Sequence, residues 1–239
     1  MDLFEAIDAT SYDFVKNLIN IITNIDRKDV YGKTHLMYAS EKGHKDVCRL
    51  LIDSKHSYED ICTLVNEKDK SGKNALMYAF ENKYYDICEL LIENSGESMD
   101  GMTSLMFASK NGSINMCSYL ITKGIDVNAI NRNNKNAEAG MNALMFASKE
   151  GHKEICKLLI KNGADVNAKN EYEGNGEDGW SALIYAIAYK HKDICCLLIE
   201  KGANVNNVDA IGSTPLMFAK EAEDEELCEL LIANGATVC

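Results

Sequence analysis

The sequence predicts an all-α fold, a solenoid of about seven stacked helix pairs. Three observations carry this prediction. Six blocks of 21 residues align without a gap, and a fixed period is the mark of a repeat architecture. Each block contains two short segments whose apolar residues recur at helical spacing. A single proline in 239 residues leaves few helices interrupted.

The six blocks each open on a glycine and share the same order of residue types. They begin at Gly32, Gly72, Gly101, Gly140, Gly179 and Gly212. A seventh, weaker copy opens the chain, because Leu3, Ala6 and Val15 fall in register with a Leu, an Ala and a Cys of the later blocks. We therefore expect about seven repeats, of which the first and last close the two ends of the stack.

The first helix of each block is expected to start after a Thr, Asn or Ser and to run for about eight residues. Thr34 stands at such a start, where a side-chain oxygen can accept a hydrogen bond from a free backbone N–H. Gly43 and Gly151 stand where the helix ends in a left-handed residue. Lys190 and Glu223 stand where other blocks have this glycine, and a non-glycine residue in that conformation costs about 1 kcal/mol.

The second helix of each block carries its apolar residues on one face. The block from Gly140 shows the pattern in Ile155, Cys156, Leu158 and Leu159. Neither helix of a block is long enough to be stable alone. Each pair must therefore bury its apolar face against the neighbouring pairs.

Two stretches of the chain carry a recognisable pattern. The block from Gly212 contains G-x-T-P-L-x-x-A, and residues 151–168 read G-H-K-E-I-C-K-L-L-I-K-N-G-A-D-V-N-A. Both resemble the ankyrin repeat family, whose period is about 33 residues, and the resemblance covers essentially the whole chain. It implies an ankyrin-repeat solenoid in which a β-hairpin finger loop joins each helix pair to the next.

The resemblance implies one ankyrin-repeat domain over residues 1–239. Its parts are a capping repeat at 1–28, repeats at 29–68, 69–97, 98–136, 137–175 and 176–208, and a C-terminal capping repeat at 209–239. One departure from the family is systematic, because its T-P-L-H histidine, which hydrogen-bonds between repeats, is replaced. The residues at this position are Met37, Met77, Met106, Met145, Ile184 and Met217. We expect apolar packing to substitute for that hydrogen bond.

Three connections between blocks are longer than the family needs. Residues 53–71 contain SYEDICTL, which is expected to form an extra helical turn with Ser57 and Asp60 spaced like a capping box. Residues 122–139 and 161–178 are lengthened fingers with added polar residues. Two interpretations of these fingers stay open: tolerated surface loops, since insertions there cost little, or an enlarged binding lip.

The composition excludes several classes of function. The chain has 25 Lys+Arg against 37 Asp+Glu and a formal charge of −12, whereas a nucleic-acid binder needs a basic face. No apolar run approaches the roughly 20 residues of a membrane span, and the N-terminus does not read as a signal peptide. Nine cysteines without a C-x-x-C motif indicate reduced thiols, so we expect a cytoplasmic protein that binds neither nucleic acid nor membrane.

Six of the cysteines occupy one repeat position. They are Cys48, Cys88, Cys117, Cys156, Cys195 and Cys228. Neighbouring helices pack roughly 8–10 Å apart, too far for a disulfide or a shared zinc ion, so we expect these cysteines to be buried as small apolar residues. Cys196 should be exposed, and with Cys62 and Cys239 it is a candidate reactive thiol.

No catalytic motif can be assembled from the sequence. We find no H-E-x-x-H, G-x-G-x-x-G, Walker loop or G-x-S-x-G, and we expect no enzyme activity, cofactor or metal. His44, His152 and His191 share one repeat position at the start of the second helix, which is a structural position in the family. The acidic run from Glu221 to Glu229 is either an interaction patch or the polar outer face of a terminal cap.

The resemblance implies that a partner lies in a concave groove lined by finger tips and first helices. Mapped onto this chain, the expected partner-binding residues are Lys33, Lys42, Lys73, Met102, Met141, Asp178, Trp180, Tyr189 and Ile211. The three lysines would supply charge for an acidic partner segment. Trp180 is expected to be exposed as the centre of a hot spot, or alternatively to fold back onto the finger of the neighbouring repeat. The aromatic row of Tyr38, Tyr78, Phe107, Phe146, Tyr185 and Phe218 is expected to pack between repeats.

The sequence therefore predicts a non-enzymatic scaffold for protein–protein interaction. Its partner is an unidentified protein, and we expect a monomer because no long apolar stripe demands a dimer. One alternative is a regulatory or inhibitory subunit that blocks an enzyme with its long fingers, through residues 131–138 or 171–177. The other is a redox- or metal-responsive protein that uses its free cysteines.

Overall fold

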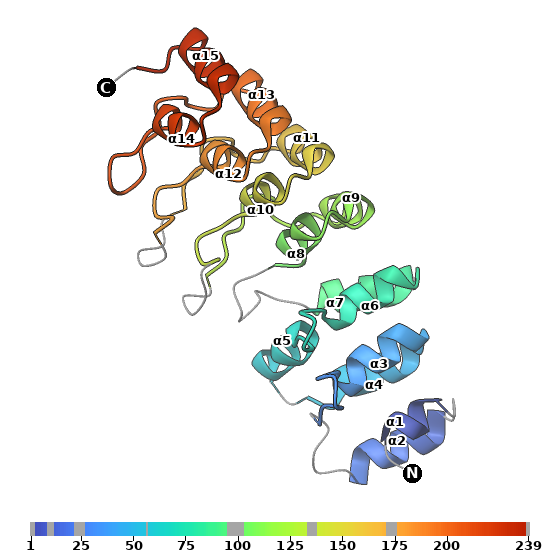
Figure 1. Cartoon of the computed structure of the whole chain (residues 1–239). Coiled ribbons are helices and arrows are strands. Elements are labelled where there is room, and N and C mark those ends of the chain that lie inside the picture. The colour runs from blue at the N-terminus through green and yellow to red at the C-terminus, as the bar shows by residue number, and fades with distance from the viewer. Residues whose placement is uncertain are drawn as a thin grey trace. The chain divides into compact units, whose positions relative to one another are not determined.

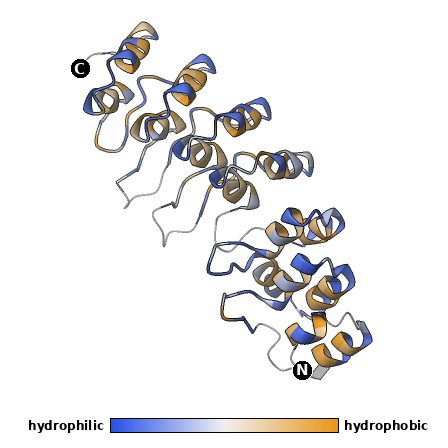
Figure 2. Ribbon diagram, turned by 45° about the vertical axis from the view of Figure 1, so that its right-hand side comes forward, coloured by the Kyte–Doolittle hydropathy of each residue, from blue (hydrophilic) through white to orange (hydrophobic). Residues whose placement is uncertain are grey.

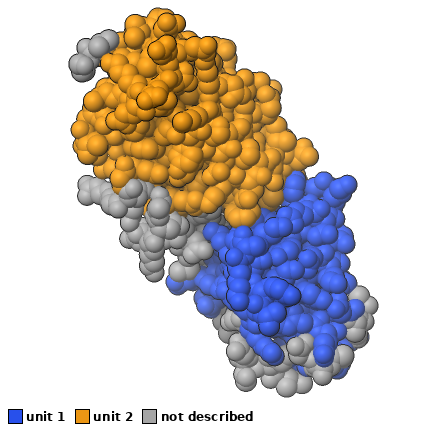
Figure 3. All heavy atoms as spheres, viewed as in Figure 1, with its two compact units in different colours: residues 1–100 blue, residues 101–239 orange. Residues whose placement is uncertain are grey.

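The chain folds into helices joined by turns. The computed structural model describes residues 3–8, 12–21, 27–55, 57–94, 103–132, 138–170 and 176–237. These residues form 15 helices, which confirms the predicted all-α class. The chain divides into two compact units, residues 1–100 and 101–239 (Figure 3). The expected single domain and its repeat boundaries stay predictions.

Unit 1 contains three helix pairs and one additional helix. The pairs are α1 (Leu3–Asp8) with α2 (Tyr12–Ile21), α3 (His35–Lys42) with α4 (Lys45–Asp53), and α6 (Ala75–Glu81) with α7 (Tyr85–Glu93). The first helices pack in the order α1, α3, α6, and the second helices in the order α2, α4, α7 (Figure 1). The additional helix, α5 (Tyr58–Asn66), packs on α4 and α6.

Unit 2 contains four helix pairs stacked in the same way. They are α8 (Ser104–Lys110) with α9 (Ile114–Thr122), α10 (Ala143–Lys149) with α11 (Lys153–Lys161), α12 (Ala182–Ala188) with α13 (Lys192–Glu200), and α14 (Pro215–Glu221) with α15 (Glu225–Ala233). The first helices pack in the order α8, α10, α12, α14 (Figure 1). The second helices of this unit carry both hydrophobic and hydrophilic residues, as one-sided packing requires (Figure 2).

The first helices begin as predicted, and a sulfur atom completes the cap. Thr34 Oγ1 accepts a hydrogen bond from the N–H of Met37 at 3.3 Å, and the Met37 Sδ accepts one from the N–H of Thr34 at 3.3 Å. Thr103 with Met106 and Thr214 with Met217 repeat this reciprocal cap. The methionines that replace the family's histidine are therefore more than apolar packing, since each of these sulfurs satisfies a free N–H of the first turn.

Left-handed residues end the first helices, and a histidine covers two of them. Gly151 has φ +82°, while Lys190 and Glu223 adopt φ of 62° and 55° at the matching positions, as predicted. The His191 ring lies over Gly151, and its Nε2 is 2.9 Å from the Lys149 carbonyl oxygen. This histidine position therefore has a structural role, as expected: its ring links one helix pair to the previous one.

The insertion in unit 1 forms more than the expected extra turn. Helix α5 has nine residues. Ser57 Oγ accepts a hydrogen bond from the N–H of Asp60 at 3.1 Å and donates to its carboxylate at 2.8 Å, which confirms the predicted start. Cys62, Leu64 and Val65 are buried on the inner side of this helix. The insertion is therefore amphipathic and adds to the core of unit 1.

The fingers pair less extensively than hairpins with full strands. Among the described residues they show isolated antiparallel bridges, which are Lys28 with Thr34, Ile130 with Asn142, and Lys169 with Ser181. Side chains stabilise the turns instead. Asp209 Oδ1 accepts hydrogen bonds from the N–H groups of Ile211 and Ser213 at 3.0 and 2.7 Å. Asn128, Asn167 and Asn206 each bridge to the next repeat through backbone groups.

The left-handed positions give a matched pair of stability predictions. Gly151→Ala should lower the free energy of unfolding by about 2 kcal/mol, because alanine is disfavoured at positive φ and its Cβ would lie 2.7 Å from Cε1 of His191. Lys190→Gly, at the same repeat position, should raise it by up to about 1 kcal/mol. Urea unfolding of both variants measures the changes. Equal midpoints for the wild type and Gly151→Ala would contradict this account of the helix ends.

Candidate functional site

The finger side of unit 2 gathers several of the predicted partner-binding residues. We call Asp178, Trp180, Tyr189 and Ile211 the finger-side surface. Ile211 is 88% exposed at a finger tip, and Tyr189 is 44% exposed at the end of α12. The Asp178 carbonyl accepts a hydrogen bond from the N–H of Ala210 at 3.0 Å, so two successive fingers are joined. These side chains therefore stand on backbone that is fixed by hydrogen bonds.

Trp180 is packed rather than free. Its ring meets Tyr185 edge to face at a centroid distance of 5.2 Å and Phe218, on α14, at 5.0 Å. The side chain is half-buried, and its Nε1 is buried without a hydrogen-bond partner. The expectation of an exposed tryptophan is therefore wrong, and the alternative holds in a modified form: Trp180 folds onto the first helix of the neighbouring repeat. An apolar ring gains more from these two rings than from water.

Met141 occupies the same repeat position and is fully buried. The N–H of Asn131 donates to the Met141 carbonyl at 2.8 Å, which holds this residue in the base of the long finger. Its apolar side chain then turns into the unit, so the expectation that Met141 is exposed to a partner is wrong. Met102 lies outside the described residues.

The predicted lysines of unit 1 already have acidic partners. Lys33 Nζ lies 2.8 Å from Glu41 and 4.3 Å from the centre of the Tyr78 ring. The remaining predicted lysines follow the same rule, because Lys73 pairs with Glu81 at 2.6 Å and Lys42 with Asp8 at 3.2 Å. This surface presents ion pairs rather than free positive charges, which weakens the case for an acidic partner segment.

A charged and aromatic network supports the second long finger. Lys149 Nζ lies 3.3 Å from Glu177 and 5.1 Å from the centre of the Tyr189 ring. Tyr185 donates its hydroxyl to Glu177 at 2.8 Å and accepts a hydrogen bond from Asn170 Nδ2 at 3.0 Å. Burial, together with the nearby Glu177 carboxylate, raises the pKa of Tyr185, so this hydroxyl stays protonated as a donor.

Neither Lys149 nor Glu177 is among the expected partner-binding residues, although the sequence carries a signal for this network. A lysine ends the first helix and a glutamate stands two residues before the next block's glycine in both long-fingered repeats. The second such pair is Lys110 with Glu138, an ion pair between α8 and the following finger. The repeated spacing, rather than either residue alone, could have predicted the contact.

Five of the six cysteines in the row are buried as predicted. They are Cys48, Cys88, Cys117, Cys156 and Cys195, whereas Cys228 is only half-buried, so the prediction is wrong for Cys228. Cys196 is exposed, as expected. Burial raises the pKa of Cys195 to about 12 and that of Cys156 to about 11. Cys62 is buried on the inner side of α5, which argues against its expected reactivity, and Cys239 lies outside the described residues.

The described part of the chain contains no group of three His, Cys, Asp or Glu residues placed to hold a metal ion. None of its helices has the length and apolar character needed to cross a bilayer.

The aromatic row packs as predicted for Phe146 and Tyr185, which are fully buried.

Comparisons with known proteins agree with this architecture. The model for ankyrin repeats (3 copies) matches residues 3–100, 93–170 and 170–239. Among solved structures, the chain is similar to the crystal structure of the ankyrin repeat domain of Bcl-3, described as a unique member of the IkappaB protein family. The match covers 97% of this chain and 98% of that one, with a TM-score of 0.68 and 22% identity, and it shows the fold alone. No curated protein matches this sequence.

Cysteine reactivity should follow burial. A thiol reacts as its thiolate, so iodoacetamide should alkylate exposed Cys196 at least about tenfold faster than Cys62 or Cys195. The raised pKa of Cys195, about 12, keeps that thiol protonated from pH 7 to pH 9. Peptide mass spectrometry gives each rate, and equal rates at Cys62 and Cys196 would contradict the burial of α5.

Trp180 should tolerate one aromatic replacement. Trp180→Phe retains a ring between Tyr185 and Phe218 and removes the buried N–H that has no acceptor. Leaving such a group unsatisfied costs about 1–3 kcal/mol, so its removal should offset the lost packing and keep the change within about 1 kcal/mol. Trp180→Ala should cost about 2 kcal/mol or more. Urea unfolding measures both changes. If the two variants are equally destabilised, the unpaired Nε1–H of Trp180 does not affect the free energy of unfolding.

Proposed function

This chain belongs to the ankyrin repeat family, and we propose that it is a non-enzymatic scaffold that binds another protein on its finger-side surface. Ankyrin repeats are in general modules of protein–protein interaction, and the family match indicates no catalytic activity. The proposal adds the location of the contact and the residues that make it.

The exposure of Ile211 carries the proposal. This large apolar side chain is 88% exposed at the tip of a finger whose backbone is fixed by Asp209. Tyr189 lies beside Lys149, so an aromatic ring and the stem of a lysine offer a second contact. Exposed apolar and aromatic groups on fixed backbone lose little entropy on binding, which makes them effective anchors.

The charge of the surface favours a partner that is not strongly acidic. Lys149 forms an ion pair with Glu177, and the three predicted lysines of unit 1 form ion pairs with other carboxylates. A partner that competed for these lysines would have to separate existing pairs. We therefore place apolar contacts at Tyr189 and Ile211 at the centre of the interaction, with the ion pairs as its polar rim.

The inhibitory alternative has one observation in its favour. The bases of both long fingers are braced, by Lys110 with Glu138 and by Lys149 with Glu177. Braced bases suit fingers that present their inserted residues to another protein. Under this alternative, the inserted residues rather than Tyr189 and Ile211 make the decisive contact.

The proposal also includes a monomer in a reducing compartment such as the cytoplasm. The eight described cysteines are unpaired, which supports this location. The formal charge of −12 supports a protein partner rather than a nucleic acid.

A three-bait capture experiment tests the finger-side surface. The baits are the wild type, Tyr189→Ala with Ile211→Ala, and Ile114→Ala, which removes a comparably exposed apolar side chain from α9. We expect a partner from native lysate to be retained by the wild type and by Ile114→Ala, and to be lost at least about tenfold from the double variant.

A fourth bait distinguishes the inhibitory alternative. It lacks residues 133–137 and 171–175, and circular dichroism checks that every bait is folded. Loss of the partner from this bait, with retention by the double variant, would replace the finger-side surface with the long fingers. Equal capture by all four baits would contradict both interpretations.

A further inference from the structure

The turns between first and second helices are fastened to one another at two junctions of unit 2. The His152 ring lies over Gly112, and its Nε2 is 3.1 Å from the Lys110 carbonyl oxygen. His191 makes the same contact over Gly151 at the next junction. Because a carbonyl only accepts hydrogen bonds, each Nε2 carries the proton and donates it. Each ring therefore fastens its helix pair to the preceding pair.

The glycine and the ring depend on each other at these junctions. A Cβ at Gly151 would lie 2.7 Å from Cε1 of His191. In unit 1, a Cβ at Gly43 would lie 2.6 Å from Cε1 of Tyr84, which holds the same repeat position as the histidines. Both distances are shorter than van der Waals contact. A side chain at the left-handed position therefore excludes a ring in this place.

The junction between pair α12/α13 and pair α14/α15, which we call the last junction, has neither the glycine nor the ring. Lys190 stands at the glycine position with φ 62°, and Asp224 stands at the histidine position. A carboxylate cannot donate to a carbonyl, and Asp224 Oδ1 instead accepts the N–H of Leu227 at 3.0 Å in its own helix. A cavity of about 50 Å³ lies between the two pairs and has room for water. Its lining includes Ile187, Lys190, Cys195, Ala222, Asp224 and Leu227.

The sequence contains one other pair of this kind. Lys83, with φ 65°, stands at the glycine position, and Ser113 stands at the histidine position of the following repeat. The chain divides into its two compact units between these residues. The absence of both the glycine and the ring therefore coincides with a division of the chain.

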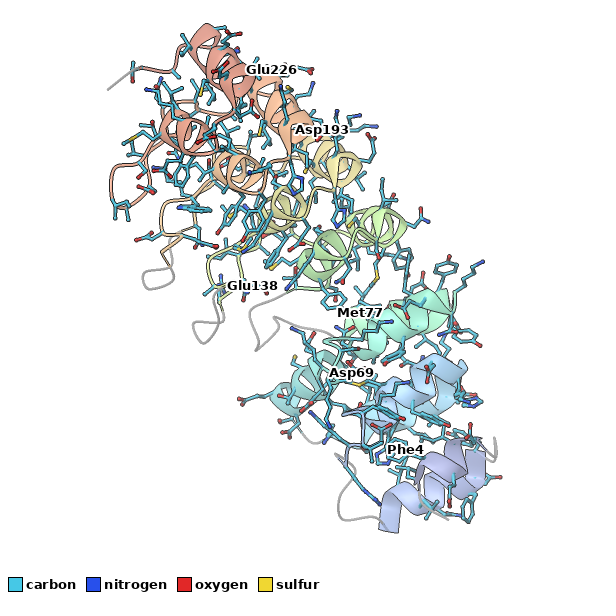
Figure 4. All side chains as sticks on the ribbon, viewed as in Figure 1. Phe4, Asp69, Met77, Glu138, Asp193 and Glu226 are labelled. Carbon is cyan, nitrogen blue, oxygen red and sulfur yellow. The ribbon has the colours of Figure 1, made fainter. Side chains whose placement is uncertain are left out.

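The helices also pack less closely at the last junction. Helix α12 packs more extensively on α10 than on α14, and α13 packs more extensively on α11 than on α15. An exposed ion pair joins the second helices at both junctions, Lys153 with Asp193 at the earlier one and Lys192 with Glu226 at the last (Figure 4). Because this ion pair is present at both junctions, it does not make up for the missing histidine contact.

The fingers hold the two pairs together at the opposite ends of the first helices. The N–H of Ala210 donates to the Asp178 carbonyl at 3.0 Å. A Cβ at Gly179 would lie 2.7 Å from the Cα of Asp209, so the two finger backbones are in close contact there. The last junction is therefore closed at the fingers and has its cavity at the turns.

The only tryptophan of the chain lies across this junction. The Trp180 ring contacts Tyr185 of α12 at 5.2 Å and Phe218 of α14 at 5.0 Å. Its Nε1 is buried without a hydrogen-bond partner, which raises the free energy of the closed arrangement. Separation of α14 from α12 would give this N–H access to water and recover part of that free energy.

We propose that the last junction is a hinge built into unit 2. The pair α14/α15 swings about the finger contact between Asp178 and Ala210, which widens the cavity beside Lys190 and withdraws Phe218 from Trp180. Opening costs less here than at the junctions fastened by His152 and His191, because no ring has to leave its carbonyl and a buried N–H becomes hydrated.

Opening changes the finger-side surface, a consequence that rests on the proposed function. The open state offers the Trp180 ring and its Nε1–H donor in addition to the side chains of Tyr189 and Ile211. A partner with a hydrogen-bond acceptor opposite Nε1 binds the open state better than the closed state and shifts the chain toward it. The hinge thus regulates whether Trp180 takes part in binding.

Solvent exchange of the Trp180 indole N–H tests the hinge in the full chain, because a single tryptophan gives a single indole signal in the NMR spectrum. The locked variant, Lys190→Gly with Asp224→His, restores the glycine and the ring. Its matched control, Lys190→Gly with Asp224→Ala, has the same glycine, lacks the ring and loses the same hydrogen bond to Leu227. We expect indole exchange in the locked variant to be at least about tenfold slower than in the control.

A second measurement uses the repeat itself as the control. Lys157 on α11, Cys196 on α13 and Glu229 on α15 hold the same repeat position and are exposed. Spin labels at Cys196 and Glu229→Cys span the last junction, and labels at Cys196 and Lys157→Cys span the junction fastened by His191, with Cys228 and Cys239 replaced by alanine. We expect the distance distribution across the last junction to be at least about twofold wider.

Either of two results would overturn the hinge. One is equal indole exchange in the locked variant and its control, and the other is equal width of the two distance distributions. Neither measurement uses a partner, so failure of the finger-side proposal in the capture experiment leaves both results unchanged. The distance measurement needs no substitution at Lys190 or Asp224, so it decides the question even if the locked variant does not fold.

Discussion

Mutual burial of neighbouring helix pairs is the constraint on which this structure depends. The helices have between six and ten residues, too few for any of them to be stable alone in water. Their apolar faces, small buried residues such as Ala39 and Ala147, and the histidine that bonds to the preceding repeat all serve the contact between pairs. The fingers gain their position from the same contact, since the asparagine bridges join one repeat to the next. Surfaces for interaction with other molecules arise where a repeat has side chains that take no part in this burial.

The same residue type therefore has a different meaning at different places in a unit. Met145 on α10 is buried, whereas Met217, at the same repeat position on α14, is 44% exposed. Lys149 pairs with Glu177 of the next finger, whereas Glu221, at the same repeat position, is exposed. Residues at the same repeat position can therefore be compared with one another. A residue that departs from the pattern marks a position that is not used for packing between repeats.

The local features of the fold could be predicted from the sequence. Caps, left-handed helix ends and the buried cysteine row follow from residue type and spacing, and the structure confirms Thr34, Lys190 and Cys156 in these roles. The burial of Met141 could not be predicted, because it depends on which parts of the folded unit pack around this residue. The partners of Lys33 could not be predicted either, since ion pairs depend on which side chains meet across turns and repeats. The role of the Met37 sulfur as a hydrogen-bond acceptor at the helix cap could not be predicted either, because methionine is usually treated as an apolar residue.

Hydrogen exchange of the intact chain, followed by mass spectrometry, tests the dependence on mutual burial most directly. Stability that comes from neighbours predicts the slowest exchange in α10 to α13, which have a helix pair on both sides. It predicts faster exchange in α14 and α15, which have one neighbouring pair among the described residues. Exchange in α14 and α15 that is as slow as in α12 would contradict the account, because it would show that a helix pair holds its structure without a second neighbour.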